Sequence, residues 1–147
     1  MKALIQRVLE ASVEIEGVEA SRIGQGFLVL LGVTHSDTEK EADHIAERIS
    51  ALRIFEDENG KTNRSVVDVG GSVIVVSQFT LYADTSQGRR PGFSQAARPE
   101  VARPLYERVV AKLRAILGEE NVGTGRFGAD MKVRLLNDGP FTVEVLA

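Results

Sequence analysis

The sequence predicts an α+β fold: a single domain over residues 1–147, with a compact, mostly antiparallel, barrel-like sheet and two main helices. Short apolar runs separated by turn residues recur through the chain, as in β-rich domains. Two longer segments instead show the helical spacing of apolar residues. The 147 residues with 43% hydrophobic content suit one domain with its own core.

The N-terminal part is predicted to form a β-meander. The run FLVLLGV, residues 27–33, is apolar on both faces and therefore predicts a central strand. Glu16-Gly17 predicts a turn between two of the earlier strands. The strands expected before the central one cover residues 4–9, 13–15 and 18–23.

A first helix is predicted from about residue 37 to residue 53. Ser36-Asp37-Thr38-Glu39 has the pattern of a capping box, and apolar residues then recur at spacings of three and four. Asn59-Gly60 is predicted to be the turn that closes this segment.

The second half is predicted to hold a strand, a helix and a strand pair. Residues 72–81 are rich in Val and Ile and predict a strand that ends in polar residues. Pro104 suits a helix start, and an apolar stripe follows it as far as Gly118. Residues 131–136 and 141–146 are predicted to be paired strands joined by the turn Asn137-Asp138-Gly139-Pro140.

Charge and composition exclude several classes of protein. There is no cysteine, so disulfides, thiolate metal sites and cysteine nucleophiles are excluded. No apolar run has membrane-spanning length and the N-terminus lacks a signal-peptide pattern, so we expect a cytoplasmic protein with no membrane partner. The net charge of −3 argues against a generally basic nucleic-acid binder.

The charge is nevertheless uneven along the chain. Residues 1–85 carry 8 Lys+Arg and 14 Asp+Glu, whereas residues 86–134 carry 10 and 5, a net of +5. One interpretation is a solvated helix face with intrahelical ion pairs. The other is a local patch that meets phosphate groups, which dominate nucleic-acid affinity. The sequence leaves both open.

Common catalytic patterns are weak in this chain. His35 and His44 have no motif around them and are interpreted as structural or solvent-facing. No pattern of metal ligands occurs, so no metal and no cofactor are expected. The GxGxxG spacing at residues 123–128 precedes a strand instead of opening a helix, so it does not predict a dinucleotide site.

Two stretches remain as candidate sites. Ser77-Gln78-Phe79-Thr80 places hydroxyls and an amide at a strand end, although a polar strand end facing water explains the same pattern. Asn137-Asp138-Gly139-Pro140 is an unusual hairpin because proline cannot donate to the ladder. An ordinary hairpin turn is its alternative explanation.

Several motifs together resemble one family. SQFTLYAD at 77–84, GRRPGFSQAARPE at 88–100, GADMKV at 128–133 and NDGPFT at 137–142 are similar to the D-aminoacyl-tRNA deacylase family of the bacterial and eukaryotic type. RIFEDENGKTN at 53–63 and DVGGSVIVVSQ at 68–78 extend the resemblance over nearly the whole chain.

The resemblance implies a homodimer with active sites at the subunit interface, acting on aminoacyl-tRNA at its 3′-terminal adenosine and acceptor stem. It implies Ser77, Gln78, Phe79 and Thr80 as catalytic residues, with Thr80 a proposed nucleophile. Because no base adjoins Thr80, the residues favour direct attack by water, assisted by the substrate's ribose 2′-hydroxyl. The residues implied in substrate binding are Asn137, Gly139, Pro140, Met131 and Phe127.

The resemblance also implies that Gly139–Pro140 is a cis bond that reaches into the partner's pocket and excludes L side chains. Glycyl-tRNA, which has no side chain to exclude, is then also expected to be accepted. Arg89 and Arg90 are predicted to lie where the acceptor-stem phosphates pass. Two other classes remain open: a non-catalytic module that binds the tRNA acceptor end or a small amino-acid ligand, and a purely structural dimer.

Overall fold

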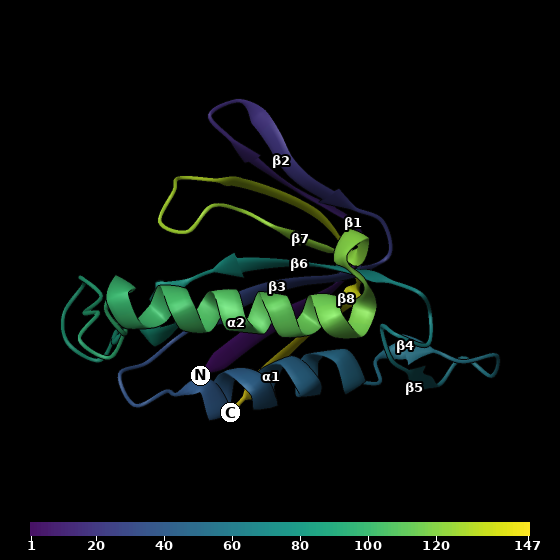
Figure 1. The fold of residues 1–147 in the computed structure, drawn as a ribbon, viewed down its shortest axis with the longest axis horizontal. Helices are drawn as coiled ribbons and strands as arrows, with labels where there is room; N and C mark the ends of the chain where they lie inside the picture. The colour runs from purple at the N-terminus through teal and green to yellow at the C-terminus, as the bar shows by residue number, and fades with distance from the viewer.

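The computed structural model describes residues 1–147 as a mixed β-sheet with two α-helices on one face (Figure 1). The main sheet has the strand order β2-β1-β3-β6-β7, and β8 pairs with the other side of β1. A two-stranded sheet, β4-β5, lies apart from it. The sheet is mixed: β3–β6 and β6–β7 are parallel, whereas β1 pairs antiparallel with β2, β3 and β8, so most of the pairing is antiparallel as predicted. The predicted α+β class with two helices is confirmed.

The elements have the following bounds. The strands are β1 Lys2–Ile15, β2 Val18–Ile23, β3 Gly26–Gly32, β4 Phe55–Glu56, β5 Thr62–Arg64, β6 Ser72–Ser77, β7 Val122–Thr124 and β8 Lys132–Leu146. The helices are α1 Glu39–Ala51 and α2 Pro99–Leu117, with short 3-10 turns η1 Phe79–Tyr82 and η2 Glu119–Asn121. None of the helices is long and apolar enough to cross a membrane.

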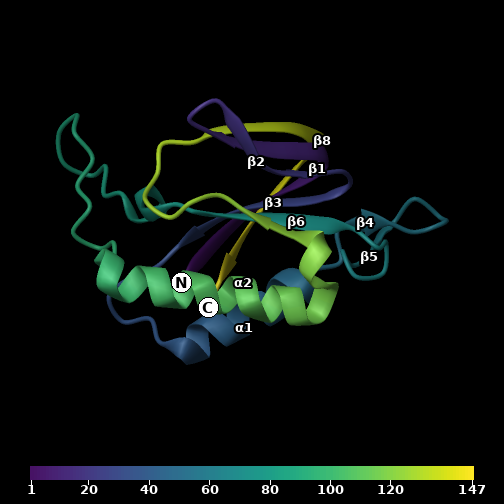
Figure 2. The ribbon, with the colours of Figure 1, turned by 45° about the horizontal axis from the view of Figure 1, so that its top comes forward.

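The central strands are buried on both faces, as the run of apolar residues at 27–33 predicted. Phe27 and Val73 point into a cluster of 25 buried residues beneath α1 and α2. Their neighbours Leu28 and Ile74 point into a second cluster of seven buried residues on the opposite face. Figure 2 shows both helices on one side of the sheet and β2 on the other. Adjacent side chains of a strand point to opposite faces, so each central strand contributes to both clusters.

Helix α1 starts slightly later than predicted. Its capping box uses Thr38 and Glu41: the Lys40 amide donates to the Thr38 hydroxyl, and the Thr38 amide donates to the Glu41 carboxylate. Asp37 accepts a 2.6 Å bond from the Met1 ammonium group instead of capping the helix. Asn59-Gly60 lies in the β4–β5 connection, so it turns a hairpin and does not close the helix.

Helix α2 starts five residues before the predicted position. Pro99 occupies the first turn, where its missing amide costs no helical bond, and Pro104 lies inside the helix. Placing the start at Pro104 was therefore wrong. The helix ends at Gly118 as predicted, with a φ of 97° that favours glycine.

The predicted strand pair near the C-terminus is wrong. Residues 132–146 form one long strand, β8, which pairs along its length with β1, itself one strand where two were predicted. Gln6 pairs with Thr142 and Val8 with Asn137, so residues 138–141 bulge opposite Arg7. Pairing with β1 gives both halves of β8 a longer ladder than a local hairpin would.

The bulge contains the expected cis Gly139–Pro140 bond and is held by the buried Arg7 side chain. Arg7 Nε donates to the Asp138 carbonyl at 3.0 Å, and Nη1 donates to the Ile54 carbonyl at 2.6 Å. The guanidinium also lies 4.8 Å from the centre of the Phe141 ring. One side chain therefore fixes the bulge and connects it to the segment after α1.

We expect Arg7→Met to lower the free energy of unfolding by about 3 kcal/mol, because two carbonyls lose their charged donor. Urea unfolding measures this change. The matched control is Arg22→Met, which removes an exposed strand arginine paired with Glu19 and should change stability by less than about 0.5 kcal/mol. Equal effects of the two variants would contradict the role assigned to Arg7.

Candidate active site

The candidate site forms where β6 ends. The Gln78 amide donates to the Leu31 carbonyl at 2.8 Å, which continues the pairing of β6 with β3 by one residue. The chain then turns into η1, so the strand ends at Ser77. The prediction that it continues to Leu81 was wrong. Leu81 donates to Gln78 and Ala83 to Thr80, and no backbone bond of the turn uses the amides of Phe79 or Thr80. These amides are free to bind a ligand.

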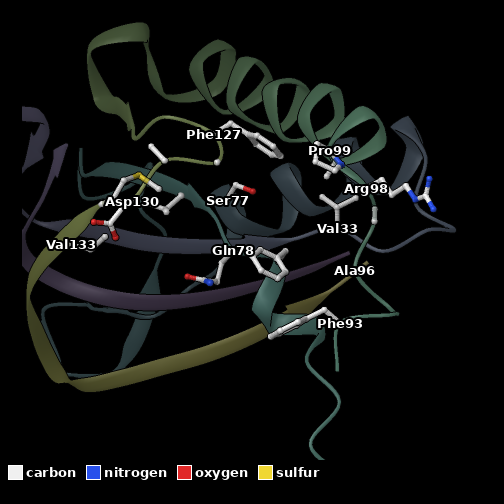
Figure 3. Close-up of a pocket in the computed structure, with 17 residues that line it drawn as sticks. Val33, Ser77, Gln78, Phe93, Ala96, Arg98, Pro99, Phe127, Asp130 and Val133 are labelled. Carbon is white, nitrogen blue, oxygen red and sulfur yellow. The ribbon is translucent and has the colours of Figure 1, made fainter. Parts of the chain in front are cut away.

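A cavity of about 630 Å³ lies against this turn. In Figure 3, Asp130 and Val133 lie at one end of the view and Arg98 and Ala96 at the other, with Ser77 between them. Most of the lining is apolar: Val33, Val76, Phe79, Phe93, Ala96, Ala97, Pro99, Ala102, Phe127, Ala129, Met131 and Val133 take part. This volume is typical of a small-molecule pocket.

The structure brings five of the predicted site residues together around the cavity. Ser77, Gln78 and Phe79 come from the end of β6, and Phe127 and Met131 come from the segment between β7 and β8. Thr80 does not line the cavity, although its hydroxyl contacts the Gln78 side-chain amide.

The residues of the predicted turn lie elsewhere. Asn137, Gly139 and Pro140 do not line this cavity in their own chain. The Asn137 side-chain oxygen accepts a 3.0 Å bond from the Phe141 amide, which closes the bulge, and Gly139 and Pro140 are exposed. The bulge is therefore accessible to another molecule.

Arg89 and Arg90 also lie outside the cavity, in the exposed loop between η1 and α2, which extends away from the rest of the chain (Figure 2). The base of this loop is closed by paired backbone bonds between Asp84 and Gly92, both 2.8 Å long.

Three bonds fix the rim of the cavity that carries Phe93 and Ala96. The Thr34 hydroxyl donates to the Gln95 carbonyl at 2.6 Å, and the Ala97 amide donates to the Val33 carbonyl at 2.9 Å. A ring nitrogen of His35 lies 2.7 Å from the Ser94 carbonyl oxygen. His35 therefore has a structural contact, as predicted, and neither histidine lines the cavity.

The cavity contains no paired nucleophile and base. Its ionisable lining residues are Arg98 and Asp130, and Asp130 is exposed and paired with Lys132 at 2.7 Å. Behind the wall, burial raises the pKa of Tyr106 to about 12, and its hydroxyl donates to the Val75 carbonyl. This phenol stays neutral near pH 7 and cannot accept a proton as a base.

Several lining residues were not assigned from the sequence. Phe93, Ala96, Arg98 and Pro99 all lie in the motif GRRPGFSQAARPE, which carried the resemblance without any assigned role in the pocket. Arg7 was not assigned a role either. The sequence signal for it was that Arg7 is the only charged residue in the predicted strand at 4–9. A buried arginine almost always has partners, so this position indicated specific contacts.

Together, the mixed sheet and the mostly apolar cavity at the end of β6 define a small domain with an enzyme-like pocket. The chain belongs to the D-Tyr-tRNA(Tyr) deacylase family, whose family model matches residues 4–146.

Relatives at high identity agree with this assignment. The chain is 57% identical to a D-aminoacyl-tRNA deacylase of Heliobacterium modesticaldum, covering 99% of this chain and 95% of the relative. It is 55% identical to one of Brevibacillus brevis, covering 99% of each chain. A relative of the same description from Symbiobacterium thermophilum is 53% identical over 143 residues, covering 97% of this chain and 93% of the relative.

Solved structures share the fold. A structure described as a c-Myc DNA unwinding element binding protein is 42% identical, with a TM-score of 0.95 over 100% of this chain and 99% of its own. A probable eukaryotic D-amino acid tRNA deacylase superposes with a TM-score of 0.86 over 98% of this chain and 97% of its own, at 18% identity, and shows the fold alone.

Gly32 sets the position of the η1 turn. A Cβ atom added at Gly32 would lie 3.1 Å from Leu81 Cβ and 3.2 Å from both the Gln78 carbonyl oxygen and a Tyr82 ring carbon. These contacts are tighter than ordinary packing, so β3 and the turn approach closely only without a side chain at this position.

We expect Gly32→Ala to shift the turn and reduce kcat for D-tyrosyl-tRNA(Tyr) deacylation about tenfold or more, because misplacement by a fraction of an ångström lowers rate steeply. Steady-state kinetics and thermal unfolding measure the two effects separately.

Two glycines provide matched controls. Gly71→Ala introduces a similarly crowded Cβ, 3.0 Å from Val66 and 3.1 Å from the Gln25 carbonyl, away from the cavity. Gly24→Ala adds a Cβ with no neighbour within 4 Å. If Gly71→Ala lowers kcat as much as Gly32→Ala at equal loss of stability, the positioning role of Gly32 is wrong.

Proposed function

We propose that this protein hydrolyses the ester bond that joins a D-amino acid, or glycine, to the 3′-terminal adenosine of tRNA. The products are free tRNA and the amino acid, so the reaction removes wrongly charged tRNA before translation uses it. Membership of the deacylase family carries the proposal and confirms the expectation of a D-aminoacyl-tRNA deacylase drawn from the sequence motifs. The cavity beside Ser77, Gln78 and Phe79 supports it.

The chemistry of the site fits direct attack by water. An aminoacyl ester is an activated acyl group, so orientation and a polarised carbonyl supply much of the required rate. The Phe79 amide is the proposed donor to the developing oxyanion, and Ser77 and Gln78 provide polar contacts. Water adds to the carbonyl carbon, and the ribose 3′-oxygen leaves with a proton. The neighbouring 2′-hydroxyl of the substrate assists the transfer of this proton.

Thr80 has an orienting role in this mechanism. Its hydroxyl accepts from the Gln78 side-chain amide and makes no hydrogen bond to a carboxylate or histidine that could take its proton. A threonine hydroxyl without a base is a weak nucleophile.

Chirality is read, in this proposal, by the bulge of a second protomer. Gly139 and Pro140 are exposed and lie outside the cavity of their own chain. A two-fold homodimer places each bulge in the partner's cavity, where backbone carbonyls accept from the substrate ammonium group and leave no room for an L side chain. Glycyl-tRNA passes the same filter because it has no side chain to exclude.

The direct test compares D-tyrosyl-tRNA and L-tyrosyl-tRNA by following loss of the acyl group. We expect rapid hydrolysis of the D substrate alone. Binding of both tRNAs without loss of the acyl group would instead support the non-catalytic binding module.

For the mechanism, we expect Thr80→Ala to retain activity within about tenfold of the unchanged protein. A threonine nucleophile predicts a loss on the order of 10³-fold or more. Single-turnover hydrolysis of D-tyrosyl-tRNA measures the difference, and Thr85→Ala in the exposed loop is the matched control. An acyl-enzyme trapped on Thr80 would overturn the water mechanism.

For the bulge, we expect Gly139→Ala to lose most D-specific hydrolysis while the chain remains folded. The φ of Gly139 is +139°, and an added Cβ would lie 2.9 Å from the Phe141 amide nitrogen, so the bulge must change shape. Sedimentation tests the dimer at the same time: a 16.0 kDa species alone at micromolar concentration would contradict a site completed by the partner.

A further inference from the structure

A second hollow adjoins the candidate active site. It has a volume of about 290 Å³ and is formed by α2 and by the segment that follows β7. Phe127 lines both this hollow and the main cavity. We call it the arginine groove, after Arg103 and Arg114 of α2 and Arg126 of the segment.

The charge of the arginine groove differs from that of the other cavities. Its lining carries three arginines against one carboxylate, Glu107. The main cavity carries one charge of each sign, Arg98 and Asp130. A third hollow, near the β1–β2 turn, has three carboxylates against two cations. The groove is therefore a local positive site on a chain whose net charge is −3.

The arginines are available to a ligand. Arg103 lies 3.0 Å from Glu107 and Arg126 lies 3.4 Å from Glu16, and in both pairs each side chain is about half exposed or more. Such exposed pairs are worth about 0–1 kcal/mol, so a phosphate can replace the carboxylate at little cost.

Arg114 is less exposed and uses its donors poorly. Its two terminal nitrogens make only long contacts, 3.4 Å to Glu119 and 3.5 Å to the Val122 carbonyl. Its Nε is buried and has no acceptor. The buried Nε is out of reach of a ligand, but the long contacts of the two terminal nitrogens leave these donors open to a stronger acceptor such as an anion.

We propose that the arginine groove binds backbone phosphates of the tRNA strand whose 3′ end occupies the main cavity. This inference rests on the proposed function. The shared Phe127 wall means that a strand leaving the cavity over this residue meets the groove at once. Phosphate is the chemistry that a fork of guanidinium donors recognises, because two parallel N–H groups match two of its oxygens.

The groove places the tRNA strand differently from the loop that carries Arg89 and Arg90. The groove arginines project from a long helix and from a segment packed against it, with Phe127 6.0 Å from the Tyr106 ring. Arg89 and Arg90 project from an exposed loop outside either cavity. A site on packed elements holds its donors in place, so it loses less freedom on binding.

The test measures binding of uncharged tRNA to Arg103→Gln and Arg126→Gln across a salt series. Each variant should weaken binding about fivefold at low salt and reduce the slope of log K against log[salt] by about 0.7–0.9, the value for one lost phosphate contact. Arg108→Gln is the matched control: this α2 arginine pairs with Glu39 and Asp43 of α1 and lines neither cavity. Arg89→Gln tests in the same assay whether the exposed loop contacts the tRNA.

A second measurement separates the groove from the chemistry. Hydrolysis of D-tyrosyl-adenosine, an ester without phosphates, is compared with hydrolysis of D-tyrosyl-tRNA. We expect kcat/KM of Arg103→Gln and Arg126→Gln to fall about fivefold or more on tRNA relative to the adenosine ester.

Three outcomes are decisive. Salt slopes equal to that of Arg108→Gln would overturn the proposal. Equal losses on both esters would also overturn it, since the arginines would then act through the cavity. If the unchanged protein hydrolyses neither D ester, the proposed function fails, and the salt slopes with uncharged tRNA still decide whether the groove binds phosphate.

Discussion

The contacts of the buried Arg7 guanidinium decide the shape of the β1–β8 pair. One arginine stands opposite four residues of β8, and the extra chain stays ordered because Arg7 donates to the Asp138 carbonyl and packs on the Phe141 ring. Its second donor binds the Ile54 carbonyl, beside the start of β4. A charged side chain is costly to bury unless its donors are used, so the same bonds that stabilise Arg7 also hold the bulge in one conformation.

The cavity depends on a different constraint, the close approach of β3 to the turn after β6. The parallel pairing of the two strands brings Leu31 beside Ser77, and Gly32 lets η1 lie directly against β3. The rim that carries Phe93 is held by bonds from residues 33–35. The η1 turn and the rim that carries Phe93 are therefore both attached to the C-terminal end of β3. These attachments make the site rigid without any ionisable cluster.

A site of this kind separates chemistry from recognition. The activated ester needs few catalytic groups, so the proposed oxyanion donor is a backbone amide. In the proposed mechanism, selection depends on shape at the bulge and on charge in the arginine groove. The groove collects Arg103, Arg114 and Arg126 from two segments, so a chain with net charge −3 still presents one positive hollow beside its cavity. Local placement of charge matters more here than the total.

The sequence by itself determined the class of fold, the central strand at 27–33, the first helix, the end of the second helix at Gly118, and the family. These follow from periodicity, from glycine at a helix end and from motifs of neighbouring residues. It did not determine that residues 132–146 form one strand, because a local turn and a bulge opposite a distant arginine give the same sequence pattern. The start of α2 was misplaced because Pro99 and Pro104 both suit a first turn. The resemblance implied Phe127 and Met131 as site residues, but only the tertiary structure gave Arg7 its partners and added Phe93 and Arg98 to the cavity, since these contacts join segments that are distant along the chain.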